Sequence, residues 1–239
     1  MRGQTSQSEP TDPGPATDSV KLQILATEHW GLLATRSMLW NEIFTRAGMF
    51  LTTLSAATVA IALVAQASEF GPEFRLFAVI VLPVVLFLGV ATHARLGVAS
   101  EQEIWSVVGM NRLRYAYMEI APDLEPYFIN SHYDDFPGLL QSSGQYRRIR
   151  PSMIITSTPL IVAVLNAVIA GVLVALLAGY VVDRTVTSTV MGVAVGIALA
   201  AYLVGVLPYR DISRAQRDYV PRFPRPDTTG ATPRTDDEA

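Results

Sequence analysis

The three histidines are scattered, but one short run, His132, Tyr133, Asp134 and Asp135, places side chains that could bind a metal or carry out acid–base chemistry next to one another. Imidazole nitrogens and carboxylate oxygens bind divalent metals, but a site needs three or four ligands that converge. The run has no helical spacing that would bring its side chains together. We therefore expect a solvated loop here, and the alternative is a lipid-modifying enzyme in which His132 and Asp135 converge.

Other motifs of catalysis are absent from the sequence. The chain has no cysteine, which excludes a thiol nucleophile, disulfides and thiolate metal sites. It also has no nucleophile elbow, no glycine-rich phosphate loop and no HExxH spacing. The sequence therefore predicts no enzymatic activity, no cofactor and no metal. It also predicts no binding of nucleic acid, because basic and aromatic residues do not alternate in a compact patch.

The elements of the fold that would position a functional residue are predicted to be mainly apolar helices. Of the 239 residues 50% are hydrophobic and only 16% are charged, and the mean hydropathy is +0.32. Soluble domains have about 25% charged residues. Four uncharged segments are each long enough for the roughly 20 residues that a membrane helix needs. They predict an all-α polytopic membrane protein with four transmembrane helices, at about 47–68, 76–94, 154–182 and 186–208.

The basic residues set the predicted topology. Of the 18 Lys and Arg residues, 16 lie before the first span, between the second and third, or after the fourth. The positive-inside rule then places both termini and the middle segment in the cytoplasm, with the chain crossing the plasma membrane several times. The other two connections are too short to pass around another helix, so the spans pair into two hairpins, 47–94 and 153–209.

The polar ends of the chain predict disordered tails. Residues 1–19 and 210–239 are rich in Pro, Thr and Asp and poor in large apolar side chains, a composition typical of disorder. Between the first tail and the first span, apolar residues at helical spacing predict an amphipathic helix over 20–46, with Asp18 or Ser19 as its N-cap. This helix suits either the membrane surface or packing against other cytoplasmic helices.

The middle segment, 95–152, is predicted to be a cytoplasmic helix followed by a loop. Ser100 and Glu103 have the spacing of a capping box, which indicates a helix from about Glu101 to Ile120. This helix either continues the second span or is kinked near Gly97.

Asn166 is the one strongly polar residue deep within a predicted span. An amide in hydrocarbon needs partners, so we expect it to face another helix. The alternative is a pore or ligand position, with Thr52 and Ser55 as further lining residues. No Asp, Glu, Lys or Arg lies within a span core, which argues against a proton-coupled pump, a voltage sensor or a charged transport site.

Small residues recur every four positions in the third and fourth spans. Such stripes let helix backbones approach closely, within a hairpin or between chains, although frequent Ala and Gly can also fall into register by chance. The candidate helix-packing residues are Ala163, Ala167, Gly171, Ala175, Gly179, Gly192 and Gly196.

Three arginines, Arg147, Arg148 and Arg150, directly precede the third span. Guanidinium groups at this level can contact anionic lipid headgroups, so these residues are candidates for that role. The positive-inside rule alone also accounts for them.

The segment 25–50, with Trp30, Trp40, Asn41, Glu42 and Arg46, leads directly into the first span, and the run Met110, Asn111, Arg112, Leu113 and Arg114 follows the second. These features resemble uncharacterised four-span integral membrane proteins of high-GC bacteria over about residues 22–140. The resemblance implies a bacterial membrane protein. It brings no assigned activity and so implies no site residues.

The sequence supports two functions. The first is a membrane scaffold or regulatory subunit whose cytoplasmic helices dock a protein partner. The second is a homo-oligomeric pore. The absence of charges within the membrane favours the first. The lipid bilayer is the expected surrounding in both cases, and a homo-oligomer is compatible with either.

Overall fold

The computed structural model describes residues 15–143, 157–181, 185–206 and 219–226. Within these ranges the chain is all-α and contains no strand. The elements are α1 (Pro15–Ala67), α2 (Pro72–Ile120), η1 (Pro122–Tyr127), α3 (Phe136–Ser142), α5 (Thr158–Val181), α6 (Thr185–Ala201) and η2 (Tyr202–Val206), of which η1 is a 3-10 helix and η2 a π-helical turn.

Four of these helices are long and apolar enough to cross a membrane: α1, α2, α5, and α6 together with η2. Large apolar side chains such as Leu63, Phe87 and Ile197 are more than 60% exposed on their surfaces. In water such exposure would be unfavourable, whereas lipid tails solvate it. The predicted all-α fold with four spans is confirmed.

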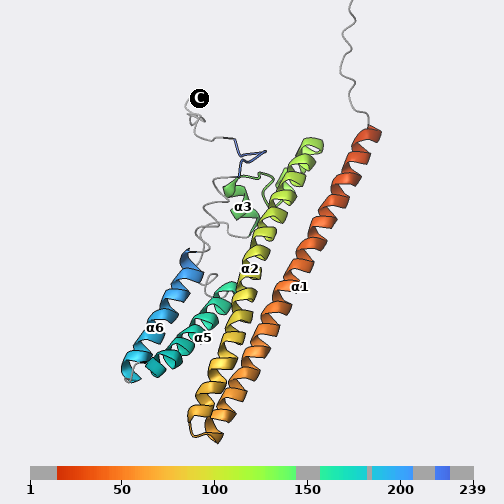
Figure 1. The fold of residues 1–239 in the computed structure, drawn as a ribbon. Coiled ribbons are helices and arrows are strands. Elements are labelled where there is room, and N and C mark those ends of the chain that lie inside the picture. The colour runs from red at the N-terminus through yellow and green to blue at the C-terminus, as the bar shows by residue number, and fades with distance from the viewer. Residues whose placement is uncertain (1–14, 144–156, 182–184, 207–218, 227–239) are drawn as a thin grey trace, which may run out of the picture.

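The first two helices are continuous rods rather than separate spans and polar helices (Figure 1). Helix α1 has 53 residues and α2 has 49, and a helix of 50 residues is about 75 Å long. The segment 20–46 therefore belongs to the same helix as the first span. The second span likewise continues unbroken through Gly97 to Ile120.

Two expected caps have other roles in these rods. Helix α1 begins at Pro15, ahead of the predicted N-cap, and Asp18 in its first turn pairs with Lys21 at 3.1 Å. Ser100 lies inside α2 and donates to the backbone oxygen of Leu96 at 2.9 Å. Local spacing indicates a helix start at both places, but the helix passes through each because no proline or turn lies beside the motif.

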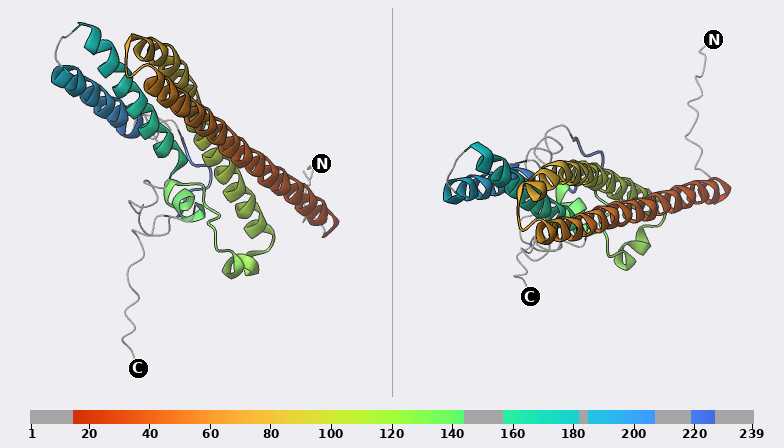
Figure 2. Two further views of the ribbon diagram at one scale, coloured as in Figure 1. Left: turned by 90° about the horizontal axis from the view of Figure 1, so that it is seen from below. Right: turned by 60° about the horizontal axis from the view of Figure 1, so that its bottom comes forward.

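The rods form an antiparallel hairpin closed by a tight turn. Glu69 and Phe70 have positive φ angles of 48° and 60°, and the Gly71 amide donates to the oxygen of Ser68 at 2.7 Å. Helix α5 packs against α2, and α6 packs against α5 on the side away from α1 (Figures 1 and 2). A buried apolar cluster that includes Phe50, Val85 and Val162 joins α1, α2 and α5.

The rods project beyond α5 and α6 at the end opposite their turn, which we call the polar end (Figure 1). It comprises residues 15–46 of α1, 95–120 of α2, the segment 121–143 and the segment 219–226. The last of these was predicted as part of a disordered tail but lies against α2 and Asp134. Residues 1–14 and the remainder of 210–239 lie outside the described residues.

Candidate functional site

Asn166 is fully buried where α5 meets α2 and α1. Its side-chain oxygen lies so close to Gly89 of α2 that a Cβ there would overlap it, and the same Cβ would lie 2.7 Å from the ring of Phe50. Neither amide atom of Asn166 has a hydrogen-bond partner among the described residues. The Asn166 amide thus packs at the contact between the two hairpins, but its polar atoms form no hydrogen bond there with the described residues.

His93 follows Gly89 by one helical turn and, like Gly89, faces α5. Its side chain is buried, and its Nδ1 atom has no hydrogen-bond partner among the described residues. The backbone oxygens of Pro159 in α5 and Leu203 in η2 face its ring. A π-helical turn leaves carbonyl groups out of the regular ladder, so η2 can present an acceptor at this position.

The other two pore candidates do not meet Asn166. Thr52 and Ser55 are exposed on α1, and Thr52 donates to the backbone oxygen of Gly48 at 2.9 Å. This hydrogen bond satisfies the hydroxyl within its own helix. Asn166 by contrast is buried, and a shared pore-lining role for the three residues stays a prediction.

The small-residue stripe lies largely at the contact of α5 with α6. A Cβ at Gly171 would lie 2.8 Å from the backbone oxygen of Gly192, and one at Gly196 would lie 2.9 Å from that of Ala167. Ala175 is also in this contact, opposite Gly192. Ala163 is fully buried, whereas Gly179 has open space around it.

The predicted lipid-contact residues Arg147, Arg148 and Arg150 lie outside the described residues. Their role as candidates for headgroup binding stays a prediction.

Ion pairs join α1 to α2 above the spans. Arg95 donates hydrogen bonds to both carboxylate oxygens of Glu42, at 2.8 and 2.7 Å, and Arg46 donates to the same carboxylate at 2.8 Å. These arginines, Arg95 first, lower the pKa of Glu42 to about 2. Six residues before Glu42 on α1, Arg36 pairs with Glu103 at 2.8 Å. The rods are therefore held in register at two levels.

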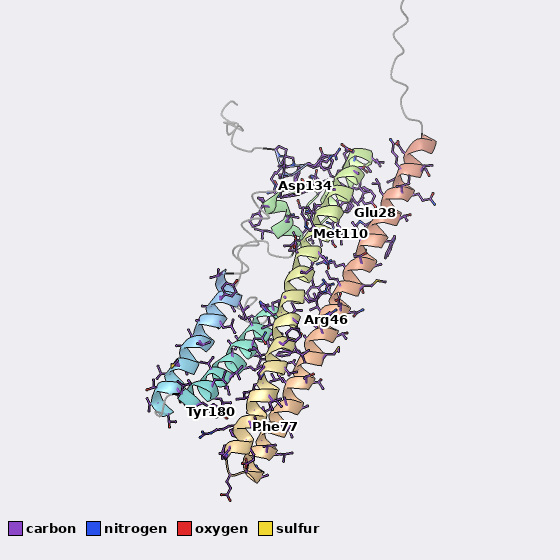
Figure 3. All side chains as sticks on the ribbon, viewed as in Figure 1. Glu28, Arg46, Phe77, Met110, Asp134 and Tyr180 are labelled. Atoms are coloured by element: carbon purple, nitrogen blue, oxygen red, sulfur yellow. The ribbon has the colours of Figure 1, made fainter. Side chains whose placement is uncertain are left out.

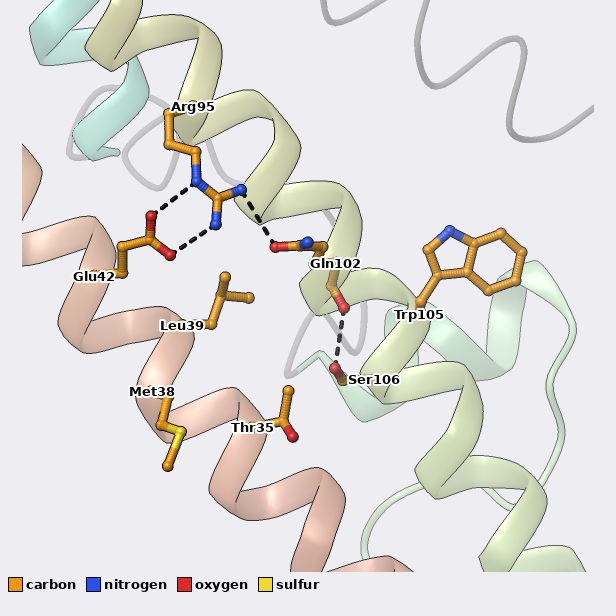
Figure 4. A pocket seen from close by; sticks show the side chains of 8 residues that line it. All are labelled: Thr35, Met38, Leu39, Glu42, Arg95, Gln102, Trp105 and Ser106. Carbon is orange, nitrogen blue, oxygen red and sulfur yellow. Dashed lines mark hydrogen bonds and ion pairs between the residues drawn. The ribbon is translucent and has the colours of Figure 1, made fainter.

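An open groove of about 430 Å³ lies between the rods beside the Glu42 and Arg95 pair (Figure 4). Its lining residues are Thr35, Met38, Leu39, Glu42, Arg95, Gln102, Trp105 and Ser106. The charged groups at its edge already bind one another, and Ser106 donates to the backbone oxygen of Gln102. The groove thus offers a mainly apolar surface.

Cationic groups are concentrated farther out between the rods. Arg114 is 8% exposed and donates to the Asn111 side-chain oxygen at 2.8 Å. Burial, and then the charge of Arg36, lowers the pKa of Arg114. Burial, and then the charge of Arg114, also lowers the pKa of His29. The neutral form of His29 is therefore favoured in the folded protein.

The most elaborate polar centre surrounds Asp134, which is labelled in Figure 3. Its carboxylate is fully buried and accepts hydrogen bonds from Nε of Arg112 at 2.8 Å, from the Arg222 amide at 3.0 Å and from the Phe223 amide at 2.8 Å. Burial raises the pKa of Asp134, but these hydrogen bonds outweigh it and the net pKa is below the ordinary value. Asp134 is therefore an ionised anchor for the segment 219–226.

Asn111 organises the base of this centre. Its amide nitrogen donates to the Tyr133 carbonyl at 2.8 Å, and its oxygen accepts from Ser142 at 2.7 Å and from Arg114. The fully buried Asn111 side chain therefore ties α2 both to the loop before α3 and to the last turn of that helix.

His132 and Asp135, the two ends of the run, make contacts that hold the local fold together. Asp135 caps α3 by accepting from the Gly138 amide at 2.7 Å, and it accepts from the Arg225 amide at 2.9 Å. The His132 ring lies against Tyr133 and Tyr115. Within the described residues, no three His, Asp or Glu side chains are placed to hold a metal ion.

The sequence singles out Asp134 only as part of the run from His132 to Asp135, and it does not predict that this carboxylate binds the C-terminal segment. Arg222 and Phe223 lie 88 and 89 positions after Asp134 along the chain. They bind the carboxylate through their backbone amides, which no side-chain pattern reveals. The available signal was the alternation of aromatic, proline and arginine residues in Tyr-Val-Pro-Arg-Phe-Pro-Arg-Pro, at 219–226.

The fold and its polar centre thus describe an all-α membrane protein with an extended polar end. The chain matches no family model, no curated protein and no solved structure. Its resemblance to four-span membrane proteins accordingly rests on the four long apolar helices.

Proposed function

We propose that this chain is a membrane scaffold or regulatory subunit that assembles through the projecting part of α1. The observation that supports it is a stripe of exposed residues with the seven-residue repeat of a coiled-coil seam. Trp30 and Phe44 in this stripe are 72% and 60% exposed. The stripe, which we call the α1 seam, consists of the half-buried Ala26 and the exposed Trp30, Leu33, Ser37, Trp40 and Phe44.

The α1 seam is distinct from the side of α1 that packs on α2. The latter side carries the buried residues Leu39 and Ile43, whereas the rings of Trp40 and Phe44 stack on each other at 5.8 Å on the exposed side. A stripe with four large exposed apolar side chains, broken only by Ser37, is unfavourable in water on a helix that projects from the bilayer. We therefore expect it to be covered.

A second copy of the chain is the occupant that we propose. An a/d seam pairs most simply with an identical seam, and a two-fold axis brings the same patch of each chain together. Both chains are anchored in one membrane, so their α1 helices would run parallel and Trp30 would face Trp30. Such a dimer would place two rod pairs side by side as a platform for a protein partner.

Cysteine cross-linking tests this assembly, because the natural chain has no cysteine. Trp30→Cys lies in the α1 seam, and Met38→Cys is a matched control that is equally exposed, at 72%, but outside the seam. We expect oxidation in native membranes to give disulfide-linked dimers for Trp30→Cys and few for Met38→Cys. Equal cross-linking at the two positions would show that the chains do not meet at the seam and would contradict the proposal. Quenching of Trp30 fluorescence by brominated lipids, in a chain whose other two tryptophans are replaced by Phe, would show that lipid covers the stripe and would also contradict it.

The proposed location is the plasma membrane of a bacterium, with the polar end in the cytoplasm. The arginine distribution supports this orientation. Single cysteines at Val20 in α1 and Phe70 in the turn, which are 57% and 67% exposed, provide the test. We expect a membrane-impermeant maleimide to label Phe70→Cys in intact cells and to label Val20→Cys only after the membrane is opened. The reverse pattern would invert the topology.

A further inference from the structure

The segment 219–226 is bound to the polar end as an extended peptide. It lies outside the helices of the bundle, and residues 207–218 connect it to η2. The Asp134 carboxylate accepts from the consecutive amides of Arg222 and Phe223, while the Asp134 amide donates to the Phe223 oxygen at 3.2 Å. These three bonds recognise the backbone of the segment, not its side chains.

Aromatic side chains from α2 supply the side-chain recognition. The Phe223 ring stacks on Tyr115 with centroids 4.3 Å apart, and the Tyr219 ring meets Trp105 edge to face at 5.6 Å. The Tyr219 hydroxyl also donates to the Asp134 carbonyl at 3.0 Å. Two aromatic anchors four residues apart are thus held in separate positions along α2.

Arg225, the second arginine of the segment, contacts an aromatic ring and a carboxylate. The Arg225 guanidinium lies over the Tyr133 ring at 5.6 Å and its backbone amide donates to Asp135 at 2.9 Å. Its side chain also reaches Gln141 at 3.4 Å. The cation–π contact with Tyr133 and the bond to Gln141 favour arginine at this position, whereas the bond to Asp135 recognises the backbone.

The segment is held by these contacts with little burial. Val220 is 81% exposed, and Arg222, Pro224, Arg225 and Pro226 are also exposed. Proline fixes φ and favours extended backbone, so a peptide of this composition loses little entropy on binding. A segment bound in this way can be released without unfolding the helices that bind it.

We propose that the surface formed by Trp105, Tyr115, Tyr133, Asp134 and Asp135 is a peptide-binding site for extended protein segments that combine two aromatic anchors with Pro-Arg pairs. The chain's own segment 219–226 occupies it in cis, and a partner protein's segment of the same chemistry binds in its place. The site shares no residue with the α1 seam and does not depend on dimer formation.

Competition with a labelled peptide tests the proposal in the full-length protein. The probe is fluorescent Tyr-Val-Pro-Arg-Phe-Pro-Arg-Pro, measured by anisotropy in detergent with empty micelles as the blank. In the wild type the tethered segment competes at an effective concentration on the order of millimolar. Phe223→Ala removes its contact with Tyr115, so we expect this variant to bind the probe at least tenfold more tightly than the wild type.

Two controls define the specificity. The probe with Ala in place of Phe should bind the Phe223→Ala protein at least tenfold more weakly, and so should the normal probe when the protein also carries Asp134→Asn. A spin label at Val220→Cys gives a reading that needs no destabilising variant, because it should become more mobile when unlabelled peptide displaces the segment. Equal affinity of wild type and Phe223→Ala, or binding that ignores both controls, or an unchanged spin label at saturating peptide, would overturn the proposal.

Discussion

Gly89 of α2 and Asn166 of α5 are in direct contact, and the Asn166 side-chain oxygen occupies the space that a Cβ at position 89 would need. Overpacking a buried contact usually costs about 1–3 kcal/mol. We therefore expect Gly89→Ala to lower the stability of the protein by an amount in this range, measured as thermal unfolding in detergent.

The same contact predicts a rescue. Asn166→Ala removes an amide that has no partner among the described residues, and loss of an unsatisfied buried polar group is close to neutral or stabilising. Gly89→Ala combined with Asn166→Ala should therefore be more stable than Gly89→Ala alone, by roughly 1 kcal/mol or more. Additive effects in the double variant would mean that the two residues are not coupled.

The α5 and α6 contact predicts a difference between two glycines. A Cβ at Gly192 would overlap the backbone of Gly171 and lie 2.7 Å from the Ala175 Cβ, whereas a Cβ at Gly179 would meet open space. Gly192→Ala should lower the unfolding temperature, and Gly179→Ala should leave it unchanged or raise it, since alanine favours the helix. Equal effects at the two positions would argue against close packing at Gly192.

Apolar segments and their lengths were enough to predict the four spans, because lipid imposes a minimum helix length that composition reveals directly. The continuity of the rods was harder to predict. Ser100 and Glu103 have the spacing of a cap, but the Ser100 hydroxyl binds within α2 and Glu103 binds Arg36 of α1. A local pattern cannot distinguish a cap from a tertiary ion pair.

The Asp134 centre escaped prediction for a different reason. The side chain of Asp134 binds Arg112 and two backbone amides far along the chain, so its neighbourhood exists only after the chain folds. By contrast, the burial of Asn166 follows from one elementary cost, that of a lone amide in hydrocarbon.

The Glu42 and Arg95 pair predicts how the rods are kept together above the spans. Glu42→Gln would remove the charge that both Arg95 and Arg46 bind. Spin labels at Met38→Cys and Val98→Cys, which are exposed on α1 and α2, report the separation of the rods. We expect a broader distance distribution in Glu42→Gln than in Glu28→Gln, a control on the same helix. Identical distributions in the two variants would show that the pair does not restrain the rods.

His29 predicts how stability depends on pH. Burial and the charge of Arg114 lower its pKa in the folded protein, whereas the unfolded chain has the ordinary value near 6.5. Below about pH 6.5 the unfolded state then binds more protons at this site than the folded state, so stability should fall as the pH decreases. Thermal unfolding between pH 8 and 5 should show this fall, and His29→Gln should reduce it. An unchanged pH dependence in His29→Gln would assign the effect to another group.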